Sequence, residues 1–143
     1  MKASKRIFEF IKEKEGLSLT AYRCSAGVWT IGYGHTGNVT PGMTITVHDA
    51  EILLKKDIQA KAEIPVNQLV HSAINQNQYD ALVSFTFNCG SGNLQKSTLL
   101  QKVNAKPNDP YIKAEFLKWN KAGGKVLPGL TKRREAEAKI YFE

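Results

Sequence analysis

The sequence has few cysteines and no long apolar segment. Its two cysteines, Cys24 and Cys89, are far apart and form no Cys-x-x-Cys pair, so no disulfide framework is indicated and synthesis in the cytosol fits best. No stretch approaches the roughly 20 apolar residues of a membrane span. The apolar run at residues 7–11 is short for a signal peptide, and Glu9 interrupts it. We therefore expect a soluble protein that is not exported by a signal peptide.

The sequence also lacks the ligand spacing of a metal site. Its three histidines, His35, His48 and His71, are scattered and form no paired-ligand motif. We therefore expect no metal and no cofactor. For His35 we expect structural support, as an imidazole hydrogen-bonded within a sheet.

Acidic residues are outnumbered in this chain. It has 20 lysines and arginines against 13 aspartates and glutamates, which gives a formal net charge of +7 at pH 7. A basic surface favours anionic partners such as nucleic acids, phospholipid surfaces or negatively charged cell-wall polymers. The basic residues are spread along the chain, and the one dense cluster, residues 132–134, is interpreted as a solvated face. Because no nucleic-acid-binding motif is visible, we expect no nucleic acid as a partner.

The apolar spacing predicts one domain, residues 1–143, of the α+β class. A first helix ends near Glu15, and alternating residues at 17–33 with a turn at 23–27 are typical of a β-hairpin. The rest of the chain shows only helical periodicity. Strands grouped apart from helices mean α+β rather than repeated βαβ units.

Two lobes are the natural arrangement for this pattern. We predict a small lobe at about 15–46 and a connecting helix at about 46–62, which should end before Pro65 because proline disfavours helix in the residue before it. Residues 1–14 and 60–143 would form the helical lobe, with a cleft between the lobes.

Capping residues predict where the later helices begin and end. A helix should start at Thr46, which with Asp49 has the spacing of a capping box. Further expected boundaries are a start at Asn75 or Asn77, an end at residues 90–92, a start at Ser97, a start at Pro110 after the cap Asp109, and a last helix over residues 131–141.

The stretch at residues 15–35 concentrates side chains that can perform chemistry: a carboxyl, a thiol, hydroxyls and an imidazole, with four glycines. One interpretation is a hydrolase with Cys24 as nucleophile and His35 as base, although no orienting third group is evident. The other is acid catalysis of glycoside hydrolysis by Glu15. A glutamate at a helix C-terminus is disfavoured by the macrodipole, which indicates another use and favours the second interpretation.

Several motifs resemble one known family. Residues 15–16, 21–22 and 27–35 resemble the catalytic stretch of phage T4-type lysozymes, which are endolysins of glycoside hydrolase family 24. That family has a glutamate, eight residues, an aspartate or sometimes a cysteine, five residues and a threonine. Glu15, Cys24 and Thr30 reproduce this spacing. The family's later blocks resemble residues 85–93, 97–100, 119 and 128–137.

The resemblance implies a muramidase with a lysozyme-like fold. It would hydrolyse the β-1,4 bond between N-acetylmuramic acid and N-acetylglucosamine in peptidoglycan, with Glu15 as general acid and with Cys24 and Thr30 positioning the nucleophile. It also implies substrate contacts and supporting residues, with Arg133 or Arg134 pairing with Glu15. The implied substrate contacts are Thr36, Phe87 and Ser97, and the implied supporting residues are His35, Arg133 and Arg134.

Cys24 stands where aspartate is commoner in the family. A thiolate could act as base or stabilise positive charge on the sugar. A free thiol with an ordinary pKa of about 8.5, however, is mostly neutral at pH 7. Covalent nucleophile and water-orienting group both stay open as roles for Cys24. The alternative is a catalytically impaired module that only binds peptidoglycan.

The resemblance also implies partners and location. A monomer would accumulate in the host cytoplasm and reach the cell wall after membrane permeabilisation by a holin-type pore, causing host cell lysis. The net charge of +7 would attract it to the anionic cell-wall surface.

Overall fold

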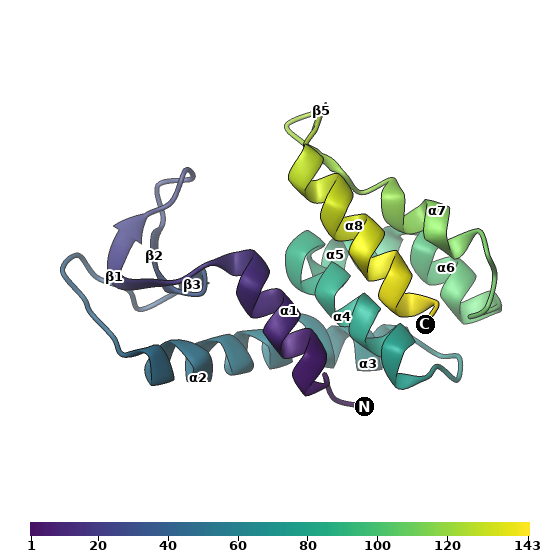
Figure 1. The fold of residues 1–143 in the computed structure, drawn as a ribbon, viewed down its shortest axis with the longest axis horizontal. Helices are drawn as coiled ribbons and strands as arrows, with labels where there is room; N and C mark the ends of the chain where they lie inside the picture. The colour runs from purple at the N-terminus through teal and green to yellow at the C-terminus, as the bar shows by residue number, and fades with distance from the viewer. The chain divides into compact units, whose positions relative to one another are not determined.

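A computed structural model describes the whole chain, Met1–Glu143. The residues form two compact units. The sheet unit is Lys5–Gln59, and the helical unit is Met1–Ser4 together with Ala60–Glu143. Figure 1 labels the elements of both units. No helix combines the length and the apolar character that crossing a membrane requires.

The sheet unit contains the predicted hairpin and a third short strand. Helix α1 (Lys5–Glu15) comes first, and its buried residues Ile7 and Ile11 lie four positions apart, on one face of the helix. The strands form an antiparallel sheet in chain order: β1 (Ser18–Arg23), β2 (Trp29–Gly32) and β3 (His35–Thr36).

Strand β2 is the central strand, and Thr30 lies on it. Thr30 is paired with Tyr22 on β1 and with Thr36 on β3. Its side chain is 3% exposed. Since a strand with partners on both edges is restrained from both sides, the position of Thr30 is set by both hairpins.

Helix α2 (Val47–Ile58) is the last element of the sheet unit and packs against β2 and β3. It begins with the predicted capping box. The Thr46 hydroxyl accepts a hydrogen bond from the Asp49 N–H at 3.1 Å, and the Asp49 carboxylate accepts one from the Thr46 N–H at 3.2 Å. Both otherwise unpaired amides are thereby satisfied.

The first helix is grouped with the sheet, whereas the sequence predicted residues 1–14 in the helical lobe. Lys12 of α1 forms an ion pair with Glu51 of α2 at 2.6 Å. At the end of α1, the Glu15 carboxylate lies beside the backbone of Gly34. These contacts hold α1 against elements of its own unit.

The helical conformation does not stop before Pro65 as expected. Helix α2 is followed by a π-helical segment, η1 (Gln59–Glu63), and then by α3 (Ile64–Leu69). Pro65 lies in the first turn of α3, directly after the π-helical segment. The proline is therefore placed where the backbone changes from π-helical to α-helical, and it does not end the helical stretch.

In the helical unit, α4 (Gln76–Cys89) is buried along residues 78–86. It packs against α8 (Pro128–Tyr141), and the two helices run side by side in Figure 1. Asn75 caps α4, and Gly90 ends it with φ +93°. The remaining elements are α5 (Ser91–Lys96), α6 (Thr98–Ala105), α7 (Ile112–Leu117), β4 (Lys121–Ala122) and β5 (Lys125–Val126).

Aromatic rings form the centre of the helical unit. Phe85 of α4 meets Phe116 and Trp119 edge to face, with centroid distances of 5.9 and 5.6 Å. Phe116 in turn meets Tyr141 of α8 at 5.7 Å. Such edge-to-face contacts contribute about 0.5–1.5 kcal/mol each beyond their buried area, so they fix α4, α7 and α8 against one another.

Candidate active site

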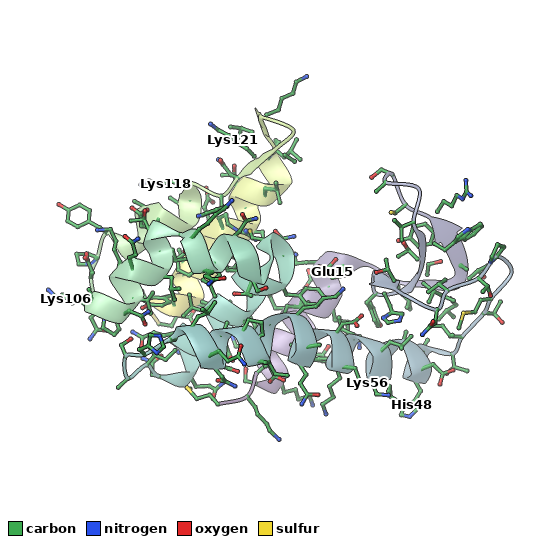
Figure 2. The ribbon with its side chains drawn as sticks, turned by 180° about the vertical axis from the view of Figure 1, so that it is seen from behind. Glu15, His48, Lys56, Lys106, Lys118 and Lys121 are labelled. Atoms are coloured by element: carbon green, nitrogen blue, oxygen red, sulfur yellow. The ribbon has the colours of Figure 1, made fainter.

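Glu15 is the last residue of α1, and Figure 2 labels it there. Gly16, with φ +69°, ends the helix in the left-handed conformation that glycine adopts without strain. A Cβ at Gly34 would lie 3.6 Å from Glu15 Oε2, so the carboxylate lies directly over the backbone of the β2–β3 turn. The local fold thus carries the acid from the helix end to the sheet.

Cys24 is the first residue of the turn between β1 and β2. Its N–H donates to the Val28 carbonyl at 3.0 Å, and its carbonyl accepts from the Gly27 N–H at 2.8 Å. Gly27 has φ +77°. The turn at residues 24–28 is therefore a tight hairpin connection closed by a left-handed glycine.

Cys24 is half-buried in this turn. The backbone amides of Val28 and Ala26, followed by the Thr30 hydroxyl, lower the pKa of the Cys24 thiol, while desolvation acts in the opposite direction. Donors directed at a sulfur favour its charged form. The site therefore favours a thiolate more than an isolated cysteine would.

Thr30 connects the turn with the central strand. Its Oγ1 donates to the Val28 carbonyl at 3.0 Å, and the hydroxyl is one of the groups that lower the pKa of the Cys24 thiol. Thr30 is thus bonded to the turn that begins at Cys24.

His35 is held by a carboxylate. Its Nδ1 lies 2.8 Å from Asp57 Oδ2, which links β3 to α2. No hydrogen bond joins His35 to Cys24. The geometry therefore does not support the interpretation of Cys24 as a nucleophile with His35 as its base.

The three residues expected to contact sugar lie in different surroundings. Thr36 is exposed on β3, and Phe87 is half-buried on α4. Ser97 is 2% exposed, and its hydroxyl donates to the Leu94 carbonyl at 2.7 Å and accepts from the Leu100 N–H at 3.0 Å. The structure gives Ser97 the predicted role of a helix cap, so we do not keep it as a substrate contact.

In the basic cluster at residues 132–134, Lys132 is exposed, but the two arginines are not part of the solvated face expected from the sequence. Arg133 and Arg134 are 5% and 0% exposed, and both lie against Glu137, which is also fully buried. Arg134 Nε is 2.8 Å from Glu137 Oε1, and the Ser84 hydroxyl donates to Glu137 Oε2 at 2.5 Å. Burial raises the pKa of Glu137, and the two guanidinium groups oppose that rise.

Arg134 makes further contacts that the sequence did not indicate. It donates to Asn88 Oδ1 at 2.7 Å and to the sulfur of Cys89, and its guanidinium lies 5.2 Å from the centre of the Phe85 ring. Glu137 lies three residues after Arg134 on α8, whereas Asn88 and Cys89 come from α4, so only the packing of α4 against α8 brings those two to Arg134. No three His, Cys, Asp or Glu side chains gather as a metal site would require.

Comparison with known proteins decides the family. The phage lysozyme family model matches residues 12–137. The chain belongs to the phage lysozyme family. The endolysin of Acyrthosiphon pisum secondary endosymbiont phage 1 is 45% identical over 145 residues, covering 99% of this chain and 98% of its own. The endolysin from Bacillus phage B103 is also 45% identical, and this chain spans 54% of its length.

Solved structures give the same result. The endolysin from Escherichia coli O157:H7 phage FAHEc1 superposes with a TM-score of 0.90 at 38% identity, covering 100% of this chain and 94% of its own. A mutant lysozyme of phage P22 gives 0.89 at 39% identity, covering 100% and 99%. The predicted resemblance and the α+β, lysozyme-like fold are thereby confirmed. As a phage lysozyme, the chain is a glycoside hydrolase of the endolysin type that acts on peptidoglycan.

Proposed function

We propose that this phage lysozyme hydrolyses the β-1,4 bond between N-acetylmuramic acid and N-acetylglucosamine, with Glu15 as the general acid. Glycoside hydrolysis needs a carboxylic acid that protonates the leaving oxygen and a second group that provides or positions the nucleophile. The family spacing assigns the first role to Glu15, whose carboxylate lies over the β2–β3 turn.

The donors around Cys24 carry the second part of the proposal. The transition state of glycoside hydrolysis resembles an oxocarbenium ion, so a negative charge near the ring stabilises it. The amides of Val28 and Ala26 favour the thiolate of Cys24. The thiolate then provides the charge that an aspartate provides elsewhere in the family, and Thr30 positions the nucleophile beside it. This argues against the alternative of a module that only binds peptidoglycan.

Substrate contacts and partners complete the proposal. Thr36 and Phe87 remain proposed sugar contacts, and the ion pair with Asp57 supports His35 as a structural residue. The pairing of Arg133 or Arg134 with Glu15 stays a prediction. We also propose that a monomer accumulates in the host cytoplasm, passes a membrane opened by a holin-type pore and is attracted to the anionic cell wall by its charge of +7.

Replacing Glu15 tests the acid directly. Glu15→Gln keeps the shape but removes the proton donor, so we expect the release of reducing ends from purified peptidoglycan to fall by about 10²–10⁴-fold. Glu13→Gln is the matched control, because Glu13 is exposed on the same helix. Wall clearing by Glu15→Gln at the wild-type rate would refute the proposal.

A second measurement separates enzyme from binding module. Wild-type protein is mixed with peptidoglycan sacculi, and both co-sedimentation and reducing ends are measured. Binding with release of reducing ends supports the enzyme. Binding without any release would favour the module in which Cys24 has replaced a needed aspartate.

A further inference from the structure

We propose that Tyr22 is a further substrate-binding residue of this phage lysozyme, and that its ring supports the apolar face of one sugar of the glycan strand. This inference rests on the proposed function, in which Cys24 and Thr30 act at the bond that is cleaved. It adds a residue that determines how tightly the glycan is held beside them.

The pairing of the strands places Tyr22 opposite Thr30. Tyr22 of β1 is paired with Thr30 of β2, which is paired in turn with Thr36 of β3. Directly opposite residues of an antiparallel pair point to the same face of the sheet, with Cβ atoms about 4.5–5.5 Å apart. Tyr22, Thr30 and Thr36 therefore form a row across one face.

Cys24 belongs to the same face. Successive side chains of a strand point to opposite faces, so Cys24, two residues after Tyr22, returns to the side of Tyr22. The Cys24 N–H donates to the Val28 carbonyl at 3.0 Å, which continues the pairing of β1 with β2 by one more residue. Tyr22 thus has Cys24 as its neighbour along the strand and Thr30 as its neighbour across the strands.

The residues between these positions show which face is which. Arg23 and Trp29 are the next pair along the hairpin, and the Arg23 guanidinium lies 5.5 Å from the centre of the Trp29 ring, so both side chains are on the opposite face. Ile31, two residues after Trp29, is fully buried on that face, where β2 packs against α2. Helix α2 therefore covers the face of Ile31, and Tyr22 lies on the other face.

The ring of Tyr22 is available to a ligand. It is 43% exposed, and no hydrogen bond, ion pair or ring contact within the protein engages its side chain. The other two exposed aromatic rings are engaged. Lys102 Nζ lies over the Tyr111 ring at 5.8 Å, and the Phe142 ring meets that of Tyr141 at 4.9 Å. Tyr22 is thus the exposed aromatic residue whose ring has no partner within the chain.

A sugar ring fits this position chemically. A pyranose presents C–H groups on one face, and their slightly positive hydrogens are attracted to the electron-rich face of an aromatic ring. Val28, two residues before Thr30 and 45% exposed, adds apolar surface to the same face of the sheet. The hydroxyl of Thr36 can bond to the polar edge of the sugar. An apolar surface with a few polar groups is the usual composition of a small-molecule site.

The test compares Tyr22→Thr with Tyr22→Phe. Threonine removes the ring and remains a favourable strand residue, whereas phenylalanine keeps the ring and removes only the hydroxyl. Soluble glycan strands from peptidoglycan are the substrate, and the release of reducing ends gives kcat and KM. We expect Tyr22→Thr to raise KM by about tenfold with kcat within about twofold, as the loss of a contact made equally in the ground and transition states does. Tyr22→Phe should keep both constants, and so should the control Tyr111→Thr, which removes an exposed ring from the helical unit.

A second measurement observes the ring itself and leaves it in place. Glu15→Gln protein labelled with 3-fluorotyrosine is titrated with the same glycan strands to concentrations well above the wild-type KM, and fluorine NMR spectra are recorded. The Tyr22 signal is assigned by its loss in Tyr22→Phe. We expect the glycan to move the Tyr22 signal and to leave the Tyr111 signal in place. This measurement decides the case if circular dichroism shows Tyr22→Thr to be unfolded.

The inference is overturned if folded Tyr22→Thr keeps the wild-type KM, if Tyr22→Phe is as impaired as Tyr22→Thr, or if the Tyr22 signal does not move with glycan. A loss of kcat alone in Tyr22→Thr would also overturn it, because a disturbed sheet would then explain the effect. Its failure is distinguishable from failure of the proposed function. An inactive Glu15→Gln together with a wild-type KM in Tyr22→Thr would refute the role of Tyr22 alone, whereas an active Glu15→Gln would refute the glycosidase mechanism.

Discussion

The two cysteines of this chain have opposite environments. Cys24, half-buried in a hairpin turn, has its pKa lowered by backbone amides and a hydroxyl. Cys89 ends helix α4, and burial raises its pKa even though the Arg134 guanidinium donates to its sulfur. The cysteine beside a cation is thus the less acidic one.

The difference shows that desolvation can outweigh a neighbouring positive charge. Burial removes the water that would stabilise a thiolate, and the charge of the Glu137 carboxylate opposes that of the Arg134 guanidinium at Cys89. At Cys24 the donors act where water still reaches the sulfur. A partly solvated turn therefore favours a thiolate more than a buried ion network does.

Removing the two thiols one at a time should give the largest difference between the two cysteines. We expect Cys24→Ala to lower kcat by about 10²–10⁴-fold, because a group acting on the nucleophile is lost, and Cys89→Ala to leave kcat within about twofold. Cys24→Asp should retain activity. Turnover of purified peptidoglycan measures all three. If Cys24→Ala were silent, Thr30 and bound water would suffice, and the functional contrast between the two cysteines would disappear.

Removing the cation beside Cys89 should mainly affect stability. Arg134→Leu leaves the buried Glu137 with an incomplete set of partners, so we expect the free energy of unfolding to fall by about 3–5 kcal/mol. Arg23→Leu, next to Cys24, should cost less than about 1 kcal/mol, since Arg23 is exposed. Urea denaturation followed by circular dichroism measures both, and equal losses would contradict the assignment of Arg134 to a buried network.

The pH profile tests the charge of Cys24. As pH falls through the lowered pKa of the thiol, the thiolate takes up a proton, so activity should fall on the acid side. Aspartate stays charged down to about pH 4, so Cys24→Asp should extend activity to lower pH. The measurement is kcat/KM against pH for both proteins. An identical acid limb in both would show that Cys24 does not set it.

Chemical labelling should give the smallest effect. Near neutral pH, iodoacetamide should alkylate Cys24 at least about tenfold faster than Cys89, because the first has the larger thiolate fraction and the better access. Peptide mass spectrometry of briefly labelled protein measures the ratio. Equal labelling, or faster labelling of Cys89, would reverse the comparison.

Local signals predicted much of the fold. The capping box at Thr46, a helix start at Asn75, the end of α4 at Gly90 and the cap at Ser97 are all present, because each depends on residues within one turn. The sequence predicts residues 90–92 only as a helix end and misses the helix α5 that begins at Ser91. It also misses the short β4–β5 hairpin, whose strands have two residues each.

One other difference is local: the last helix begins at Pro128 and not at Thr131, since proline fits the first helical position. Another depends on tertiary packing. The sequence predicts the basic run at residues 132–134 in solvent, but Arg133 and Arg134 are buried where α8 packs against α4. The spacing of Glu137 from the two arginines is visible in the sequence, whereas their burial against α4 is not.

For the candidate site, the sequence indicates residues and not their interactions. The spacing of Glu15, Cys24 and Thr30 pointed to the family, and their catalytic roles stay a proposal. The charge state of Cys24 could not be read from side-chain types. The groups that lower the pKa of its thiol most are backbone amides of the turn, which every sequence contains and only a particular turn directs at one atom.

The π-helical segment η1 has a consequence for how the length of this chain can vary. A π-helical turn contains more residues than an α-helical turn, so the segment already holds the equivalent of an insertion. Removing one residue there would let the backbone relax into an ordinary α-helix. The same deletion within α4 would instead rotate every later side chain of that buried helix about its axis. Gln59–Glu63 is thus a helical stretch in which we expect a one-residue deletion to be tolerated.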